Sequence, residues 1–424
     1  MSNTRSSPEY QHRTMRHLWL WMTSYFRQTE FMGSDENKPA IYFIHGTADW
    51  ASSGTDIAES LTSSLFSKIH LVSFQDRLQG KDIESFSIQL AHKIKFENDK
   101  NVILIGHSRG GLVATHFAKN YAEKLGVTVH SVIAITTPYK GSRLARCPLT
   151  SISDSVKDYQ KDSPFLTTLC KKPITTPHVF IAAENDWLVM EPDSYLSDTE
   201  DTAKRTIKSE DHLSVMHSGE LQETIETTLS NLKTPELELK EEGGQESQSG
   251  ENLLTTLSQM ISGIDLSGID DGKRIAIENL TEMARQSMPS QDNKADYRNW
   301  EFGVQLAIER IQKPNDELAR KLLMFHATHF VPGHSVAWKK FLGALAILAS
   351  ITIALLILTH APIIAGVSLT ALCVNSSALL VCGAALFYHG RQKSLAHAYS
   401  QLATACSIAV IASEAKQPRL LRAD

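Results

Sequence analysis

The sequence has few cysteines and no large excess of charge of either sign. Its 424 residues include five cysteines, and 42 basic residues stand against 47 acidic ones. The cysteines show no spacing typical of a metal site or of a disulfide framework, so we expect no metal ion, no cofactor and a reducing location. The nearly balanced charge gives no basic surface for a nucleic acid, and we therefore expect no nucleic-acid partner.

Charged residues are missing altogether from one long stretch near the end. No Asp, Glu, Lys or Arg lies between Lys340 and Arg391. Residues 341–359 and 363–388 are each long enough to cross a bilayer as a helix, and the proline between them favours a turn. Basic residues flank the pair, which predicts that both of its ends face the cytosol. We therefore expect a transmembrane hairpin at 339–391, the alternative being a buried helix pair in a soluble domain.

A serine between two glycines is the most informative motif. Residues 106–110 read GHSRG, after an apolar run and before a helix-like segment at 111–125. A strand, a tight turn with a serine and a helix form a nucleophile elbow, in which the serine adopts a strained backbone conformation. A Cβ at Gly106 or Gly110 would crowd such a turn. The motif therefore predicts Ser108 as a nucleophile, the alternative being an ordinary glycine-rich turn.

A nucleophilic serine needs an orienting acid and a base, which follow it in that order in this type of chain. Asp186 comes just after a predicted strand at 179–182, at the sheet edge where catalytic groups of α/β proteins gather. His212 lies between a short predicted strand at 206–208 and a helical pattern at 215–232. We expect Asp186 as the acid and His212 as the base. The rivals for the acid are Glu184, Asp193 and Asp198. The rivals for the base are His178 and His217, which we interpret as surface residues.

Two backbone amides are expected to bind the oxyanion. One is the amide of Arg109, directly after the serine, and the other is that of Thr47, on the loop after a predicted strand at 40–44. Gly46 lets this loop turn closely enough for the Thr47 amide to face the substrate oxygen. We expect His45 to brace the loop by hydrogen bonding and not to act as a second base.

Several apolar, β-branched runs are separated by segments long enough for crossover helices. This alternation predicts an α/β fold with a mostly parallel sheet, whose strands are covered by helices on both faces and therefore show no polar alternation. The runs lie at 41–44, 69–74, 102–105, 129–135 and 179–182.

The motifs at 45–46, 106–111 and 136–142 (TTPYKGS) resemble the α/β-hydrolase superfamily. Within it they are similar to lipase-like and GPI inositol-deacylase-like serine hydrolases. The resemblance covers residues 38–232 and includes 162–169 (DSPFLTTL), which is similar to a segment that many such lipases carry before the acid-bearing strand. It implies a catalytic triad of Ser108, Asp186 and His212. Arg109 departs from the apolar residue that these relatives more often have, which leaves the polarity of the acyl site open.

The composition changes along the chain predict six parts. An amphipathic N-terminal segment either rests on a membrane interface or packs on the hydrolase domain, and its apolar run is too short for a secretory signal. A linker rich in Glu, Gly, Gln and Ser is expected to be disordered. The parts are an N-terminal segment (1–37), a hydrolase domain (38–232), an acidic linker (233–252), a helical region (253–338), the hairpin (339–391) and a C-terminal helix and tail (392–424).

These features together predict a membrane-anchored serine ester hydrolase that acts on lipid or other acyl esters through an acyl-enzyme intermediate. We expect a lipase or phospholipase A in a two-span membrane protein whose hydrolase domain and termini are cytosolic. The alternatives are a thioesterase, a small-ester carboxylesterase and a membrane scaffold with a vestigial hydrolase domain. The overall arrangement resembles the lipase-like effectors that intracellular bacteria inject through Dot/Icm-type secretion systems.

Overall fold

The chain divides into two compact units, Met1–Glu246 and Ser247–Asp424. The division lies within the linker expected at 233–252. The structure, a computed structural model, describes residues 8–24, 27–47, 49–75, 80–146, 149–196, 202–232, 250–263, 279–313 and 315–330.

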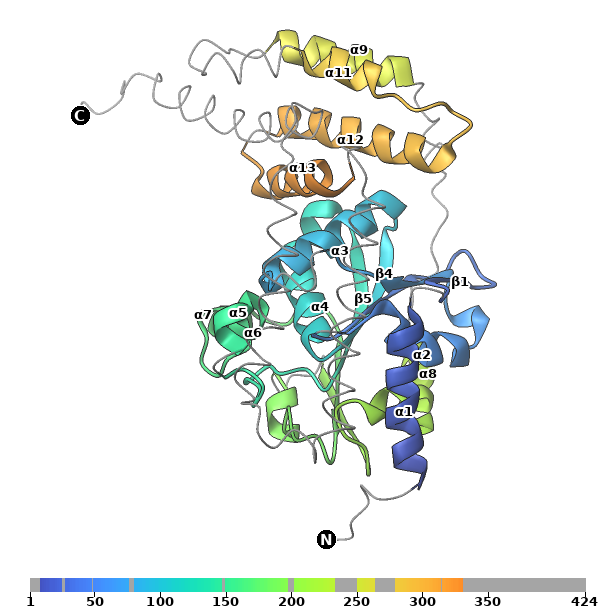
Figure 1. Ribbon diagram of the computed structural model, residues 1–424, viewed down its shortest axis with the longest axis vertical. Helices are drawn as coiled ribbons and strands as arrows, with labels where there is room; N and C mark the ends of the chain where they lie inside the picture. Colours follow the sequence, from blue (N-terminus) through green and yellow to red (C-terminus); the bar gives the residue numbers. More distant parts are fainter. Residues whose placement is uncertain are drawn as a thin grey trace, which may run out of the picture. The chain divides into compact units, whose positions relative to one another are not determined.

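The first unit is built on a seven-stranded sheet with the strand order β1-β3-β2-β4-β5-β6-β7 (Figure 1). Only β1, which pairs with β3, runs antiparallel to its neighbour. The mostly parallel sheet flanked by helices confirms the expected fold class. The strands are β1 Glu30–Met32, β2 Ala40–Ile44, β3 Lys68–Val72, β4 Asn101–His107, β5 Thr128–Ile135, β6 His178–Ala183 and β7 Thr202–Ile207.

Helices cover both faces of this sheet, which explains why its central strands are mostly apolar. Helices α3 (Ile83–Glu97) and α4 (Arg109–Asn120) lie side by side over one face. Helices α2 (Thr55–Ser60) and α8 (Gly219–Asn231) share a core with the other face. All five residues of β2 are buried. Burying each of its large apolar side chains, Ile41, Phe43 and Ile44, stabilises the fold by about 1.5–3 kcal/mol.

The register of the parallel strands brings their carboxyl ends to one edge of the sheet. Ile44 pairs with Gly106, His107 with Ile135, and Ile135 with Ile181. Ala183 pairs with Ile207 of β7 in the same way. The loops that follow β2, β4, β6 and β7 therefore leave the sheet at the same edge, and they carry the residues that the sequence predicts as functional.

Two segments that were each predicted as one helix form a helix and a separate 3₁₀ turn. The segment predicted at 111–125 forms α4 and then a separate 3₁₀ turn, Glu123–Leu125. The pattern at 215–232 forms a 3₁₀ turn, Ser214–His217, and then α8, because Ser218 has an extended backbone between them. Three short helices lie between β5 and β6, namely α5 Leu149–Ile152, α6 Asp154–Asp158 and α7 Pro164–Lys171.

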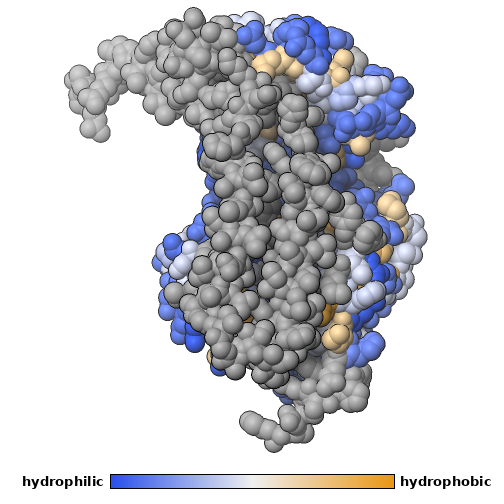
Figure 2. Space-filling model, in the orientation of Figure 1, coloured by the Kyte–Doolittle hydropathy of each residue, from blue (hydrophilic) through white to orange (hydrophobic). Residues whose placement is uncertain are grey.

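The described part of the second unit is helical. Apolar side chains of its helices face inward, while the described residues on the face in Figure 2 are mostly hydrophilic with isolated hydrophobic ones between them. The indole Nε1 of Trp300 donates a hydrogen bond to the Ala284 carbonyl at 2.8 Å and so joins two of the helices. The helices are α9 Gly250–Ser262, α11 Leu280–Gln286, α12 Lys294–Gln312 and α13 Glu317–His329.

The structure does not support the expected localisation. We expected a two-span membrane protein with cytosolic termini and a cytosolic hydrolase domain. Among the residues that the structure describes, no helix combines the length and the apolar character needed to cross a bilayer. The longest described helix, α12, has 19 residues but contains both acidic and basic side chains, which are costly in hydrocarbon. The proposed spans at 341–359 and 363–388 and the tail at 392–424 lie outside the described residues.

Candidate active site

Ser108 occupies the sharp turn between strand β4 and helix α4. Its backbone angles are φ 54° and ψ −123°, a conformation that costs a residue with a Cβ about 1–3 kcal/mol. The turn is held by backbone hydrogen bonds, because the Ser108 amide donates to the Ile135 carbonyl at 2.8 Å and the Gly111 amide donates to the Ser108 carbonyl at 3.1 Å. The serine thus sits at the end of a central strand in a strained, fixed conformation.

The two glycines around Ser108 lie where no side chain fits. A Cβ on Gly106 would come within 2.5 Å of the Gly110 carbonyl, and a Cβ on Gly110 would come within 2.0 Å of the Ile44 carbonyl. Both contacts are with backbone, which cannot move aside as a side chain can. Close packing of α4 against β2 and β4 therefore requires glycine at both positions.

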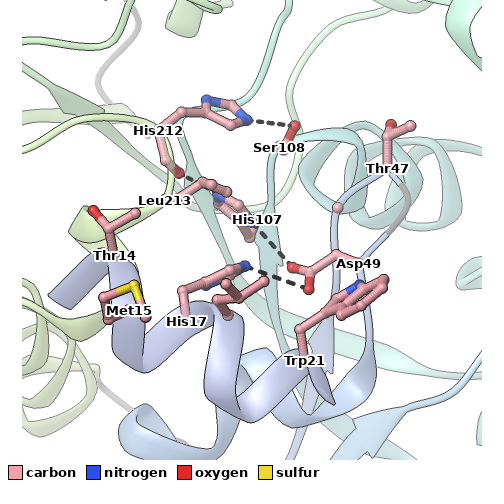
Figure 3. Close-up of a pocket in the computed structure, with 12 residues that line it drawn as sticks. Thr14, Met15, His17, Trp21, Thr47, Asp49, His107, Ser108, His212 and Leu213 are labelled. Atoms are coloured by element: carbon pink, nitrogen blue, oxygen red, sulfur yellow. Dashed lines mark hydrogen bonds and ion pairs between the residues drawn. The ribbon is translucent and has the colours of Figure 1, made fainter. Parts of the chain in front are cut away.

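The structure brings Ser108, His212 and Asp186 into one hydrogen-bonded series. His212 Nε2 lies 2.9 Å from Ser108 Oγ, and His212 Nδ1 lies 2.6 Å from Asp186 Oδ2 (Figure 3). The other carboxylate oxygen of Asp186 accepts the amides of Leu188 and Val189 at 2.8 and 2.9 Å. The Asp186 side chain is fully buried, so its orientation is fixed by these partners.

This arrangement decides which nitrogen of His212 carries the proton. Because a carboxylate only accepts hydrogen bonds, Nδ1 of His212 must donate to Asp186. In the neutral ring Nε2 is then left with a lone pair directed at the Ser108 hydroxyl. His212 is therefore in the tautomer that can take a proton from the serine.

Of the two rival acids that the structure describes, neither takes the place of Asp186 beside His212 Nδ1. Glu184 is exposed, and its Oε2 accepts the Ser209 amide at 2.9 Å. Asp193 is part of a 3₁₀ turn after β6, and Asp198 lies outside the described residues.

The rival histidines are buried, so their interpretation as surface residues is wrong. His178 Nδ1 donates to the Thr176 carbonyl at 2.6 Å, and burial lowers the pKa of His178 to about 4. His217 contacts Asp56 through Nδ1 at 2.7 Å. The His217 contact joins the turn before α8 to α2, whereas the His178 contact is local to the start of β6.

The loop after β2 approaches the serine closely. A Cβ on Gly46 would come within 3.1 Å of the Ser108 Cβ. His45 is buried, with its Nδ1 2.9 Å from the Gly46 carbonyl, and the Thr47 hydroxyl is 3.1 Å from the Tyr159 hydroxyl. These contacts fix the loop that was predicted to supply an oxyanion amide.

Arg109 contributes to the same region in two ways. As the first residue of α4 it has an amide without an acceptor inside the helix. Its buried guanidinium donates from Nη2 to the Gly46 carbonyl at 3.1 Å and lies 4.0 Å from the centre of the Phe86 ring. Burial lowers the pKa of Arg109 to about 10. The side chain thus braces the Gly46 loop from beneath and does not line the pocket beside Ser108.

A pocket of about 380 Å³ opens beside Ser108 and His212. Much of its wall belongs to α1 (Pro8–Thr23), which packs on the hydrolase domain (Figure 3). The sequence left open whether this segment contacts protein or membrane. The lining residues are Thr14, Met15, His17, Leu18, Trp21, Gly46, Thr47, Asp49, His107, Ser108, His212 and Leu213.

Sequence reasoning missed a second histidine–carboxylate group, which contacts the backbone of His212. His107 Nε2 lies 2.8 Å from the His212 carbonyl, and its Nδ1 is 3.8 Å from Asp49. His17 Nε2 reaches the other Asp49 oxygen at 3.5 Å (Figure 3). Burial alone would raise the pKa of Asp49, but the two histidines hold that pKa well below its usual range. His107 lies inside the GHSRG motif, which was the one available signal.

Within the described ranges, no cluster of three or more histidine, cysteine or carboxylate side chains could hold a metal ion. Cys170 is a free, exposed thiol.

Comparison with known proteins identifies the domain type. Residues 81–232 match the family model of the PGAP1-like alpha/beta domain. Together with the sheet topology and the serine after β4, this match confirms the expectation of an α/β-hydrolase, an enzyme of the lipase-like serine hydrolase type. The comparison with curated proteins found no match.

Part of the chain is also similar, at low identity, to several solved structures. The chain is similar to the mature lipase BlEst2 of Bacillus licheniformis, with 21% identity, TM-score 0.37, and coverage of 47% of this chain and 97% of the lipase. A gene product of Listeria innocua has 18% identity, TM-score 0.36, and coverage of 47% and 96%. A membrane phospholipase A described as a bacterial virulence factor has 14% identity, TM-score 0.35, and coverage of 53% and 93%. TM-scores below 0.5 establish no shared substrate, and the resemblance to Dot/Icm-type effectors stays a prediction.

Proposed function

We propose that this chain hydrolyses acyl esters through a covalent acyl-enzyme intermediate on Ser108. The observation that carries the proposal is the continuous series from Asp186 through His212 to Ser108, with contacts of 2.6 and 2.9 Å. A buried carboxylate that orients a histidine, and a serine within reach of that histidine, are the parts that such a reaction requires.

In the first half of the reaction, Ser108 Oγ attacks the ester carbonyl carbon while His212 Nε2 takes the hydroxyl proton. The carbonyl oxygen becomes an oxyanion, for which the amides of Thr47 and Arg109 are the proposed hydrogen-bond donors. Asp186 stabilises the imidazolium that forms on His212. The bond between the carbonyl carbon and the leaving oxygen then breaks, and His212 returns its proton to that oxygen. Base catalysis contributes about 10²- to 10⁴-fold, and each oxyanion donor about 10²- to 10³-fold.

In the second half, water attacks the acyl carbon and His212 Nε2 accepts a proton from it. The bond to Ser108 Oγ breaks, the serine recovers the proton from His212, and the carboxylic acid leaves. The same groups therefore act twice, with His212 as base and then as acid in each half.

The pocket beside Ser108 supports an ester with an apolar acyl group. Met15, Leu18, Trp21 and Leu213 line it near the nucleophile, and an apolar wall favours an aliphatic chain over a polar one. A lipase or phospholipase A activity fits this wall best. A panel of esters and thioesters with equal acyl groups separates it from the thioesterase and small-ester alternatives, since a thioesterase would prefer the thioester members.

The test compares full-length wild-type protein with Ser108→Ala and with Ser230→Ala, which changes an exposed serine on α8. We expect Ser108→Ala to lose about 10⁴-fold or more of its rate on a chromogenic ester without unfolding, and Ser230→Ala to match the wild type. A folded Ser108→Ala protein that keeps the wild-type rate would contradict the proposal.

A further inference from the structure

Helix α1 contributes apolar side chains to the pocket beside Ser108 at regular intervals. Met15, Leu18 and Trp21 are three residues apart, so they lie along one face of the helix, and all three line the pocket. Met15 and Leu18 are 61% and 46% exposed, although both are large and apolar. The wall that α1 gives to this pocket is therefore a row of apolar side chains that is accessible to a ligand.

Helix α1 is fixed to the hydrolase domain and is not a loose cover. Arg16 forms an ion pair with Asp56 at 2.7 Å, and Arg13 forms one with Glu210 at 2.7 Å. Leu20 is fully buried, and its carbonyl accepts the Ser52 hydroxyl at 2.8 Å. Contacts on both sides of Leu18 thus hold this stretch of the helix in place.

His17 ties the same helix to the loop of the catalytic histidine. Its Nδ1 is 3.0 Å from His217 Nε2, and its Nε2 faces Asp49, which in turn faces His107. His107 contacts the His212 carbonyl at 2.8 Å. The position of the apolar wall relative to Ser108 is therefore set by a continuous series of buried side chains.

We infer that Leu18, together with Met15 and Trp21, forms the acyl-chain site of this enzyme and determines which chain lengths it accepts. This inference rests on the proposed ester hydrolysis at Ser108. The occupant is the unbranched aliphatic acyl chain of the ester. Its carbonyl carbon bonds to Ser108, so the chain must extend into the pocket that opens there, and its apolar surface is stabilised against the α1 wall.

Leu18 is the best position at which to test this role. It is half exposed, so a larger or a smaller side chain is tolerated by the fold, and it lines the pocket. Trp19 is the matched control, because it follows on the same helix, is 52% exposed and does not line the pocket. The variants are Leu18→Trp, Leu18→Ala and Trp19→Ala in the full-length protein.

The assay measures kcat/KM for p-nitrophenyl esters from acetate to decanoate. We expect Leu18→Trp to lower the ratio of octanoate to acetate by about tenfold and Leu18→Ala to shift the preferred chain to a longer one, since each methylene contact is worth about tenfold or more. Trp19→Ala should keep the wild-type ratio.

Two results would overturn the inference, and they differ in what they say of the proposed function. If both Leu18 variants keep the wild-type ratio while hydrolysis still depends on Ser108, α1 does not select the chain and the proposed function stands. If no ester is hydrolysed in a Ser108-dependent manner, both the proposed function and the acyl-chain site fall.

Discussion

Replacing Asp186 by asparagine tests whether this carboxylate sets the tautomer of His212. In the wild type, Oδ1 of Asp186 accepts two amides, from Leu188 and Val189, and Oδ2 faces His212 Nδ1 at 2.6 Å. An asparagine keeps the shape of the side chain but has only one oxygen. Because the two backbone amides need an acceptor, that oxygen takes the Oδ1 position and the NH₂ group faces His212.

The consequence is a change of tautomer in His212. Its Nδ1 must then accept a hydrogen bond, so the ring proton moves to Nε2, which is 2.9 Å from Ser108 Oγ. A protonated Nε2 has no lone pair for the serine proton. We expect Asp186→Asn to lower kcat by about 10⁴-fold, equivalent to about 5 kcal/mol of transition-state stabilisation.

The assay is steady-state hydrolysis of a short chromogenic ester, with thermal unfolding to show that the variant is folded. Glu184→Gln is the control, because Glu184 is an exposed carboxylate two residues away that contacts the Ser209 amide. This variant should keep near wild-type activity. A folded Asp186→Asn protein with more than a tenth of the wild-type kcat would refute the reasoning, as would a severe loss in Glu184→Gln.

Two further predictions concern the fold around the site. Gly110→Ala should destabilise the hydrolase unit by on the order of 3 kcal/mol, because its Cβ would come within 2.0 Å of the Ile44 carbonyl. The control is Gly219→Ala, whose added Cβ has no atom within 4 Å. In thermal unfolding this variant should be as stable as the wild type or slightly more stable. Burial lowers the pKa of His178 to about 4 in the folded protein, so the unfolded chain binds this proton more tightly. The free energy of unfolding should therefore fall by up to about 3 kcal/mol as the pH decreases from roughly 6.5 to 4, and urea titrations of His178→Gln should show a flatter dependence.

Features with a local sequence pattern were predicted well. Five parallel strands contain apolar runs because both sheet faces are covered, and these runs show directly in the sequence. Ser108 lies between a strand and a helix with glycines on both sides, and Asp186 and His212 follow in order after later strands. Chain order and the sheet edge selected three residues that the structure brings into contact, and their catalytic roles stay a prediction. The edge strand β1 has only three residues, which is too short for a pattern to appear.

Features made by contacts between distant segments were missed. Asp49, His107 and His17 form one group, but His17 comes from α1 and the other two from different strand ends. No spacing in the chain links them. The apolar face of α1 was compatible with a membrane or a protein surface, because both bury the same side chains. Only the fold shows that Leu18 lines the same pocket as Ser108.

The most direct measurement of the central claim is intact mass spectrometry of the full-length protein after reaction with a fluorophosphonate. Such probes bond to a serine that a neighbouring histidine activates. The account predicts one adduct per chain, located on Ser108 by peptide mapping, strongly slowed in Asp186→Asn and absent from Ser108→Ala. A wild-type protein that remains unlabelled, or an adduct that persists in folded Ser108→Ala, would contradict the assignment of Ser108 as the nucleophile.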